Sequence, residues 1–183
     1  MLAVVLLASS CGVRREPRPG TEAEHAAYLR EDPERARAFA RLERYLERRG
    51  VGDVVPVWQL CRQGTDWRDA RLPAFAIPPE PEWPHVVPTL RLVRGEVVPA
   101  VGPVEVVSGL PHARVQRARG RARASRHPRV RRGRPRPRGR APARAPAPAA
   151  RRVWRGPGRR RRMGLGLYAG TRFHVDTHRH RRW

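Results

Sequence analysis

Apolar residues recur at helical spacing after Asp32 and indicate one amphipathic helix. The stripe consists of Ala38, Phe39, Leu42, Tyr45 and Leu46. This spacing places the five side chains on one face of a helix. Asp32 is a favourable N-cap, Pro33 suits the first helical position, and Gly50 suits the C-terminal stop. The pattern predicts a helix from about Asp32 to Gly50.

A second helical pattern begins near Val86. Its apolar positions are Val86, Val87, Leu90, Val93, Val97 and Val98. The spacing predicts a helix of about four turns, from Val86 to Val101, with Pro88 tolerated in its first turn.

Three short segments have the composition of strands. "PVEVVSG" reads as a strand closed by Gly109, and "GLGLYAG" and "RFHVDT" near the C-terminus are also strand-like. The helical N-terminal half and these strands together predict an α+β fold, in which N-terminal helices pack with a small antiparallel sheet.

The stretch from Leu110 to Arg162 has no hydrophobic periodicity and no Asp or Glu. It contains 21 of the 40 basic residues, and all 40 are arginine. Within it, "APARAPAPAA" is typical of an extended, polyproline-like chain. We therefore expect a disordered Arg/Pro-rich segment over about 110–162.

The net charge of +24 suggests a polyanion partner, but the charge is unevenly distributed. Outside the arginine-rich segment, the other 130 residues carry only +3. The chain has no Lys or Asn, whose codons are AT-rich, so a GC-rich gene accounts for much of the bias. Two interpretations follow for the segment. It is a tail that binds nucleic acid or an anionic surface at low salt, or a solvated tail beside a helical structural module.

The N-terminal "MLAVVLLASSC" predicts export. An apolar run from Leu2 to Ala8 precedes small residues and Cys11. This resembles a bacterial lipoprotein signal, with Cys11 as the lipidated residue. The run has no positively charged start, is short against the roughly 7–15 residues expected, and is too short for a transmembrane helix. We assign 1–20 to a signal peptide and linker and expect a cell-envelope protein, periplasmic or lipid-anchored to the membrane. The alternative is a frayed apolar N-terminus.

Histidines are the candidate metal ligands, because Cys11 and Cys61 are too few for a disulfide framework or a Cys-based zinc site. The histidines in suggestive positions are His127, His174 and the pair His178 and His180. A catalytic zinc site needs about three protein ligands and one open position. The alternative for each is a solvated histidine among arginines.

"VEVVSG", "GRARASRH" and "GLGLYAGTRFHVDT", closed by "RRW", occur in this order. In these motifs the chain resembles the zinc D-Ala-D-Ala carboxypeptidase-like family, small bacterial peptidoglycan peptidases that share their fold with the Hedgehog signalling domain. The resemblance implies Zn²⁺ as cofactor, His127 and His174 as its ligands, and Asp176 as a catalytic-site carboxylate that orients a ligand or the substrate. It implies peptidoglycan peptides as partners and a peptidase-like core over 103–183, which follows the helical region that the apolar patterns predict over 21–102. We expect a monomer.

Several positions depart from the family pattern. Leu110 and Pro111 stand where the family has Tyr-Arg, and Arg121 replaces a glycine. Thr171 stands where many members have an acidic general base, and Arg134 stands where the third zinc ligand, an Asp, belongs. Because Zn²⁺ needs an anion there and no base is identified, we expect the chain to be inactive as written.

A shifted reading frame accounts for the departures at Leu110-Pro111 and Arg134, for the loss of periodicity with its excess of arginine and proline, and for the return of family motifs at the C-terminus. Read one nucleotide later, the codons from Leu110 to Arg117 permit Tyr-Arg-Thr-Pro-(Ala or Glu)-Tyr-Asn, the continuation that the motif lacks. The same shift permits an Asp at the codon of Arg134. The hypothesis is a frameshift near Gly109, with the frame restored before Met163.

Two codons test this hypothesis. Tyr in the shifted frame requires a codon that ends in A at both positions, CTA or TTA for Leu110 and GTA for Val115, and such codons are unusual in a GC-rich gene. Ser125-Arg126-His127 match the family in the written frame. Either that match is chance, or several small insertions and deletions are present.

Overall fold

The computed structural model describes residues 18–65, 67–68, 71–109, 129–132, 146–168 and 170–183.

The first helix begins at a capping box. Helix α1 (Glu22–Arg30) starts where Thr21 Oγ1 accepts a hydrogen bond from the Glu24 amide, while the Glu24 carboxylate accepts one from the Thr21 amide. The hydrophobic pattern did not predict this helix, because its sequence carries only a short apolar stripe.

Helix α2 (Pro33–Arg48) confirms the predicted helix over Asp32 to Gly50. The Asp32 side chain accepts a hydrogen bond from the Glu34 amide at the N-terminus. Gly50 adopts a φ of 66° just after the helix, the left-handed conformation that ends many helices.

A long helical run follows. Two 3₁₀ turns, η1 (Val57–Cys61) and η2 (Glu80–Glu82), precede α3 (Trp83–Leu92), the π-helical turn η3 (Val93–Val97) and α4 (Val98–Val101). The predicted helix over Val86 to Val101 is confirmed, but it starts earlier, at Trp83, so Pro88 lies inside α3 and not in its first turn. The π-helical turn ends two residues before Pro99, which has no amide hydrogen to donate to the preceding turn.

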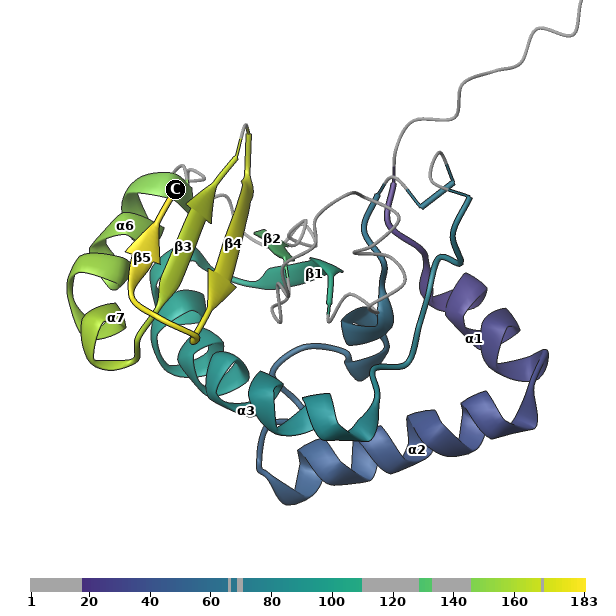
Figure 1. Ribbon diagram of the computed structural model, residues 1–183. Helices are drawn as coiled ribbons and strands as arrows, with labels where there is room; N and C mark the ends of the chain where they lie inside the picture. The colour runs from purple at the N-terminus through teal and green to yellow at the C-terminus, as the bar shows by residue number, and fades with distance from the viewer. Residues whose placement is uncertain (1–17, 66, 69–70, 110–128, 133–145, 169) are drawn as a thin grey trace, which may run out of the picture.

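Five strands form one sheet in the order β1-β2-β4-β3-β5 (Figure 1). They are β1 (Val104–Ser108), β2 (Arg129–Arg132), β3 (Gly164–Leu167), β4 (Arg172–Asp176) and β5 (Arg181–Arg182). The α+β class is confirmed. The sheet is antiparallel from β1 to β3, but β5 pairs parallel with β3. It is therefore mixed rather than wholly antiparallel, because the chain reverses after β4 and crosses to the far side of β3.

The expectation of disorder over 110–162 is wrong for its last part. Helices α6 (Pro146–Arg155) and α7 (Pro157–Arg160) lie there. Helix α6 forms because its small apolar residues Ala149, Ala150 and Val153 share one buried face, while its arginines point to solvent. Strand β2 also lies within the segment. Residues 110–128 and 133–145 fall outside the described part of the chain.

Two hydrophobic clusters hold these elements. The first joins α2, η1, α3 and β1 through Phe39, Leu42, Leu46, Leu60, Phe75, Trp83, Val86, Leu90 and Val106. The second joins the end of the long helical run to α6, β3 and β4 through Leu92, Val97, Val101, Ala149, Ala150, Val153, Met163, Leu165, Phe173 and Val175. Among the described residues, no helix combines the length and apolar character needed to cross a membrane.

Candidate functional site

Strand β4 presents different chemistry on its two faces. Successive side chains of a strand point to opposite faces, and Phe173 and Val175 enter the second hydrophobic cluster. His174 and Asp176 therefore share the other face. Both are almost fully buried, with exposed fractions of 2% and 0%. A buried polar pair beside a hydrophobic core requires hydrogen-bond partners.

His174 and Asp176 bond to each other. Nε2 of His174 lies 3.0 Å from Oδ2 of Asp176. The same carboxylate oxygen accepts a hydrogen bond from Nη2 of Arg181 at 2.8 Å, and Oδ1 accepts one from the backbone amide of His178 at 2.9 Å. Because Nε2 bonds to Asp176, the ring orientation of His174 is fixed. The other ring nitrogen, Nδ1, does not bond to Asp176.

Two glycines of β3 make room for this pair and for the C-terminal tryptophan. A Cβ atom on Gly164 would lie 2.4 Å from Oδ2 of Asp176, and one on Gly166 would lie 2.7 Å from the Trp183 indole. The Trp183 ring in turn lies 5.1 Å from the ring of His174. The G-x-G spacing in "GLGLY" therefore has a steric reason, since each missing side chain is replaced by a site residue.

The C-terminal segment closes the edge of the site. Leu167 donates its amide hydrogen to the Trp183 carbonyl, and Trp183 donates its own to the Leu165 carbonyl, both at 3.2 Å. The Arg181 guanidinium lies 4.7 Å from the centre of the Trp183 ring. His180 does not join His174: its ring stacks on Trp154 at 4.5 Å. His178 contributes its backbone amide to Asp176.

The strand register aligns motif residues in one row across the sheet. Ser108 of β1 pairs with Arg129 of β2, Arg129 pairs with His174 of β4, and His174 pairs with Gly166 of β3. Ser108 is buried, with an exposed fraction of 4%. One row therefore contains the serine of "VEVVSG", the histidine of "FHVD" and the second glycine of "GLGLY".

The other predicted site residues lie outside the described part of the chain. These are His127, which precedes Arg129 by two positions in the sequence, and Cys11. Within the described residues, no three His, Cys, Asp or Glu side chains gather where they could hold a metal ion. His174, oriented by Asp176, is suited to be one ligand, but the described side chains do not complete a zinc site.

Arg181 is the site residue that the sequence did not reveal. It follows Arg179 and precedes Arg182 in "HRHRRW", and no spacing rule distinguishes these three arginines. The structure distinguishes them, because only Arg181 is found paired with Asp176 among the described residues. A sequence signal is present only in the motif ending "RRW", which fixes Arg181 two positions before Trp183.

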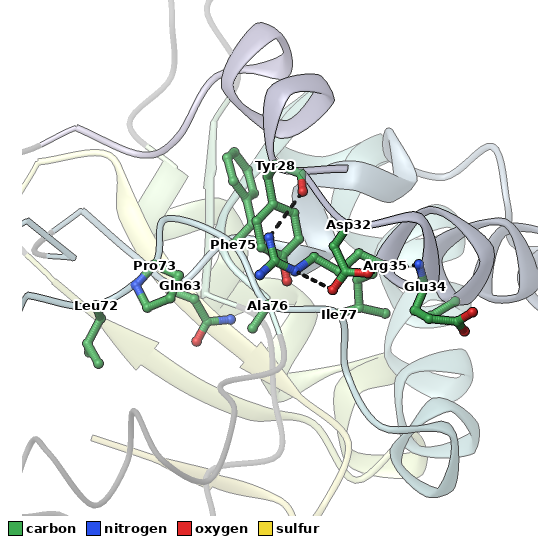
Figure 2. A pocket seen from close by; sticks show the side chains of 11 residues that line it. Tyr28, Asp32, Glu34, Arg35, Gln63, Leu72, Pro73, Phe75, Ala76 and Ile77 are labelled. Carbon is green, nitrogen blue, oxygen red and sulfur yellow. Dashed lines mark hydrogen bonds and ion pairs between the residues drawn. The ribbon is translucent and has the colours of Figure 1, made fainter. Parts of the chain in front are cut away.

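A separate pocket of about 650 Å³ lies between α1, the start of α2 and the segment 72–77 (Figure 2). Its walls include the rings of Tyr28 and Phe75 and the side chain of Ile77. Arg35 donates to the Tyr28 carbonyl and pairs with Asp32, 3.3 Å away in both cases. The charges of Arg35 and Asp32 therefore offset each other at the pocket wall, and no predicted site residue lines this pocket.

No protein-family model, curated protein or solved structure matches this chain.

Proposed function

We propose that this chain derives from the zinc D-Ala-D-Ala carboxypeptidase-like family, is exported to the cell envelope and is directed at peptidoglycan peptides. As written, it lacks a complete catalytic set. The observation that carries the proposal is the row Ser108, Arg129, His174 and Gly166. Two motifs that are far apart in the sequence, "VEVVSG" and "GLGLYAGTRFHVDT", meet in this row, and they are two of the three motifs that carry the family resemblance.

The His174–Asp176 pair supports the same proposal. Metal-binding histidines usually donate the second ring N–H to a carboxylate, which fixes the ring and raises its basicity. Asp176 stands in that relation to His174 at 3.0 Å, and Arg181 holds the carboxylate in turn. In an intact site of this type, zinc activates a water molecule for attack on the peptide bond. No such step is assigned to this chain, because an arginine occupies position 134.

Zinc binding tests the proposal. We expect the purified chain to hold little zinc, and Arg134→Asp to raise the zinc content measured by elemental analysis after dialysis, because the substitution supplies the missing anionic ligand. Adding His174→Ala to Arg134→Asp is expected to abolish the gain. Release of D-alanine from a peptide ending in D-Ala-D-Ala then tests the substrate class.

The matched control adds His85→Ala to Arg134→Asp, because His85 is exposed on α3. This double variant is expected to keep the zinc. If both double variants hold the same amount, or if Arg134→Asp binds no more zinc than the parent chain, the zinc-site proposal is wrong.

A further inference from the structure

The positive charge of the folded chain is concentrated at its C-terminal end. Residues 146–183 contain eleven arginines and one acidic residue, Asp176. Asp176 is fully buried and paired with Arg181, so it offers no charge to the surface. In contrast, residues 18–53 of the helical end contain eight acidic residues and eight arginines.

The exposed arginines lie on α6, on α7 and on the turn that follows α7. The arginine face comprises Arg151, Arg152, Arg155, Arg159, Arg160, Arg161 and Arg162, all of them exposed. Helix α6 buries Ala149, Ala150 and Val153 on its opposite side, which fixes the direction in which its arginines project. In Figure 1, α6 and α7 form the end of the molecule that is remote from α1 and α2. The protein is therefore polarised, with a near-neutral helical end and a cationic end.

Two exposed aromatic residues adjoin this end. Tyr168 and Trp183 are 42% and 50% exposed, and they are the large hydrophobic residues found exposed in the described part of the chain. The Trp183 carbonyl accepts the amide hydrogen of Leu167, the residue before Tyr168, and the Trp183 indole lies above Gly166 on the face of the sheet opposite α6. The Trp183 ring therefore does not share the surface of the arginine face. Trp154 of α6 donates to the Arg181 carbonyl at 3.1 Å, which ties β5 to the arginine face.

We propose that the arginine face docks on the surface of a bilayer containing anionic phospholipid. Clustered arginines bind the negative surface potential of such bilayers, and each contributes separately. Arginine also binds phosphates and guanine in nucleic acid, so duplex DNA is the competing polyanion in the test. The Trp154 ring, which could stack on a base, is covered by His180 and by the Arg182 guanidinium, and this favours the bilayer. This proposal is independent of the zinc-site proposal.

Vesicle flotation of the full chain tests the docking. The probes are vesicles of phosphatidylcholine alone and vesicles with roughly three parts phosphatidylcholine to one part phosphatidylglycerol, at an ionic strength of roughly 0.15 M. We expect binding to the anionic vesicles only. Replacing Arg152, Arg155, Arg159 and Arg160 with Gln is expected to reduce the partition coefficient by about tenfold or more.

The control replaces four exposed arginines of α2, Arg37, Arg41, Arg44 and Arg48, with Gln. It removes the same charge from a helix at the other end and is expected to retain most of the binding. Arginines elsewhere in the chain contribute equally in both variants. Equal losses in the two variants, no loss in the face variant, or binding to duplex DNA with no binding to anionic vesicles would each overturn the proposal.

Discussion

Gly164 and Asp176 face each other across β3 and β4 with no room for a methyl group between them. We expect Gly164→Ala to lower the free energy of unfolding by about 1–3 kcal/mol, because the new Cβ must displace a buried, fully bonded carboxylate. Urea unfolding measures the change. The matched control is Gly95→Ala in the long helical run, where no atom lies within 4 Å of the added Cβ. It is expected to be neutral or to stabilise by up to about 1 kcal/mol. Similar losses in both variants would contradict the steric account.

His25 makes folding sensitive to mild acid. It is buried on α1, its ring centre lies 4.6 Å from that of Phe39 and 5.0 Å from that of Phe75, and its Nε2 has no hydrogen-bond partner among the described residues. Burial lowers the pKa of His25 from 6.5 to about 4. Between these values the unfolded chain binds a proton that the folded chain does not. Stability is therefore full above about pH 6.5 and falls as the pH drops toward 4.

The test is His25→Phe, which keeps the aromatic packing and removes the titration. Between about pH 7 and about pH 4.5, the parent is expected to lose up to roughly 3 kcal/mol more unfolding free energy than the variant. His85→Phe serves as the control, because His85 is exposed, and it is expected to follow the parent. If His25→Phe loses as much stability on acidification as the parent, His25 is not the responsible group.

Residue-scale prediction from the sequence reached His174 and Asp176 because family motifs contain them. It did not reach Arg181 or the roles of Gly164 and Gly166. Those roles depend on which side chain occupies the space above a neighbouring strand, and this follows from strand order rather than from spacing along the chain. The burial of His25 was missed for the same reason, because its aromatic neighbours Phe39, Trp58 and Phe75 come from other elements.

At the element scale, α6 shows why the sequence predicts disorder in a part of the arginine-rich segment that is helical. Helices with Leu or Phe stripes, such as α2, are visible in the hydrophobic pattern. The buried face of α6 is made of Ala149, Ala150 and Val153, flanked by prolines 146 and 148, and this composition is equally typical of an extended chain. Prolines are tolerated in the first turn of a helix because those amides have no helical partner. Packing against β3 and α4 stabilises α6, and the sequence pattern alone does not reveal this packing.

Hydrogen exchange tests this reassignment. We expect the backbone amides of residues 150–155 to exchange far more slowly than an unfolded peptide, with protection comparable to that in α2, because α6 belongs to a hydrophobic cluster. Val153→Asp is expected to remove this protection, since it buries an unpaired charge. Arg151→Asp, on the exposed side of the same helix, is the control and should leave it intact. If residues 150–155 of the parent chain exchange as fast as an unfolded peptide, α6 is not a stable helix and the segment is disordered there.

At the scale of the whole molecule, the packed elements limit where a frameshift can lie. β1 ends at Ser108 with Val106 in the first hydrophobic cluster, and α6 begins at Pro146 with its apolar face in the second. A shifted frame would scramble such packing, so any altered reading lies between these two points. This narrows the original interval, which extended to Met163. Strand β2 lies inside the remaining interval. Its pairing uses backbone groups that every non-proline residue carries. The residues encoded in another reading frame can therefore form the same strand.

The nucleotide sequence of the gene decides the matter. We expect the Leu110 codon to be CTA or TTA and the Val115 codon to be GTA, because only these codons yield Tyr in the frame that restores the motif after Gly109. Leucines in packed elements, such as Leu42 and Leu165, are the control, and their codons should end in G or C as in any GC-rich gene. The contrast matters because a gene generally rich in A-ending codons would make the two matches uninformative. If either the Leu110 or the Val115 codon ends in G or C, the frameshift as stated is wrong. The arginine-rich segment would then be the protein's own sequence.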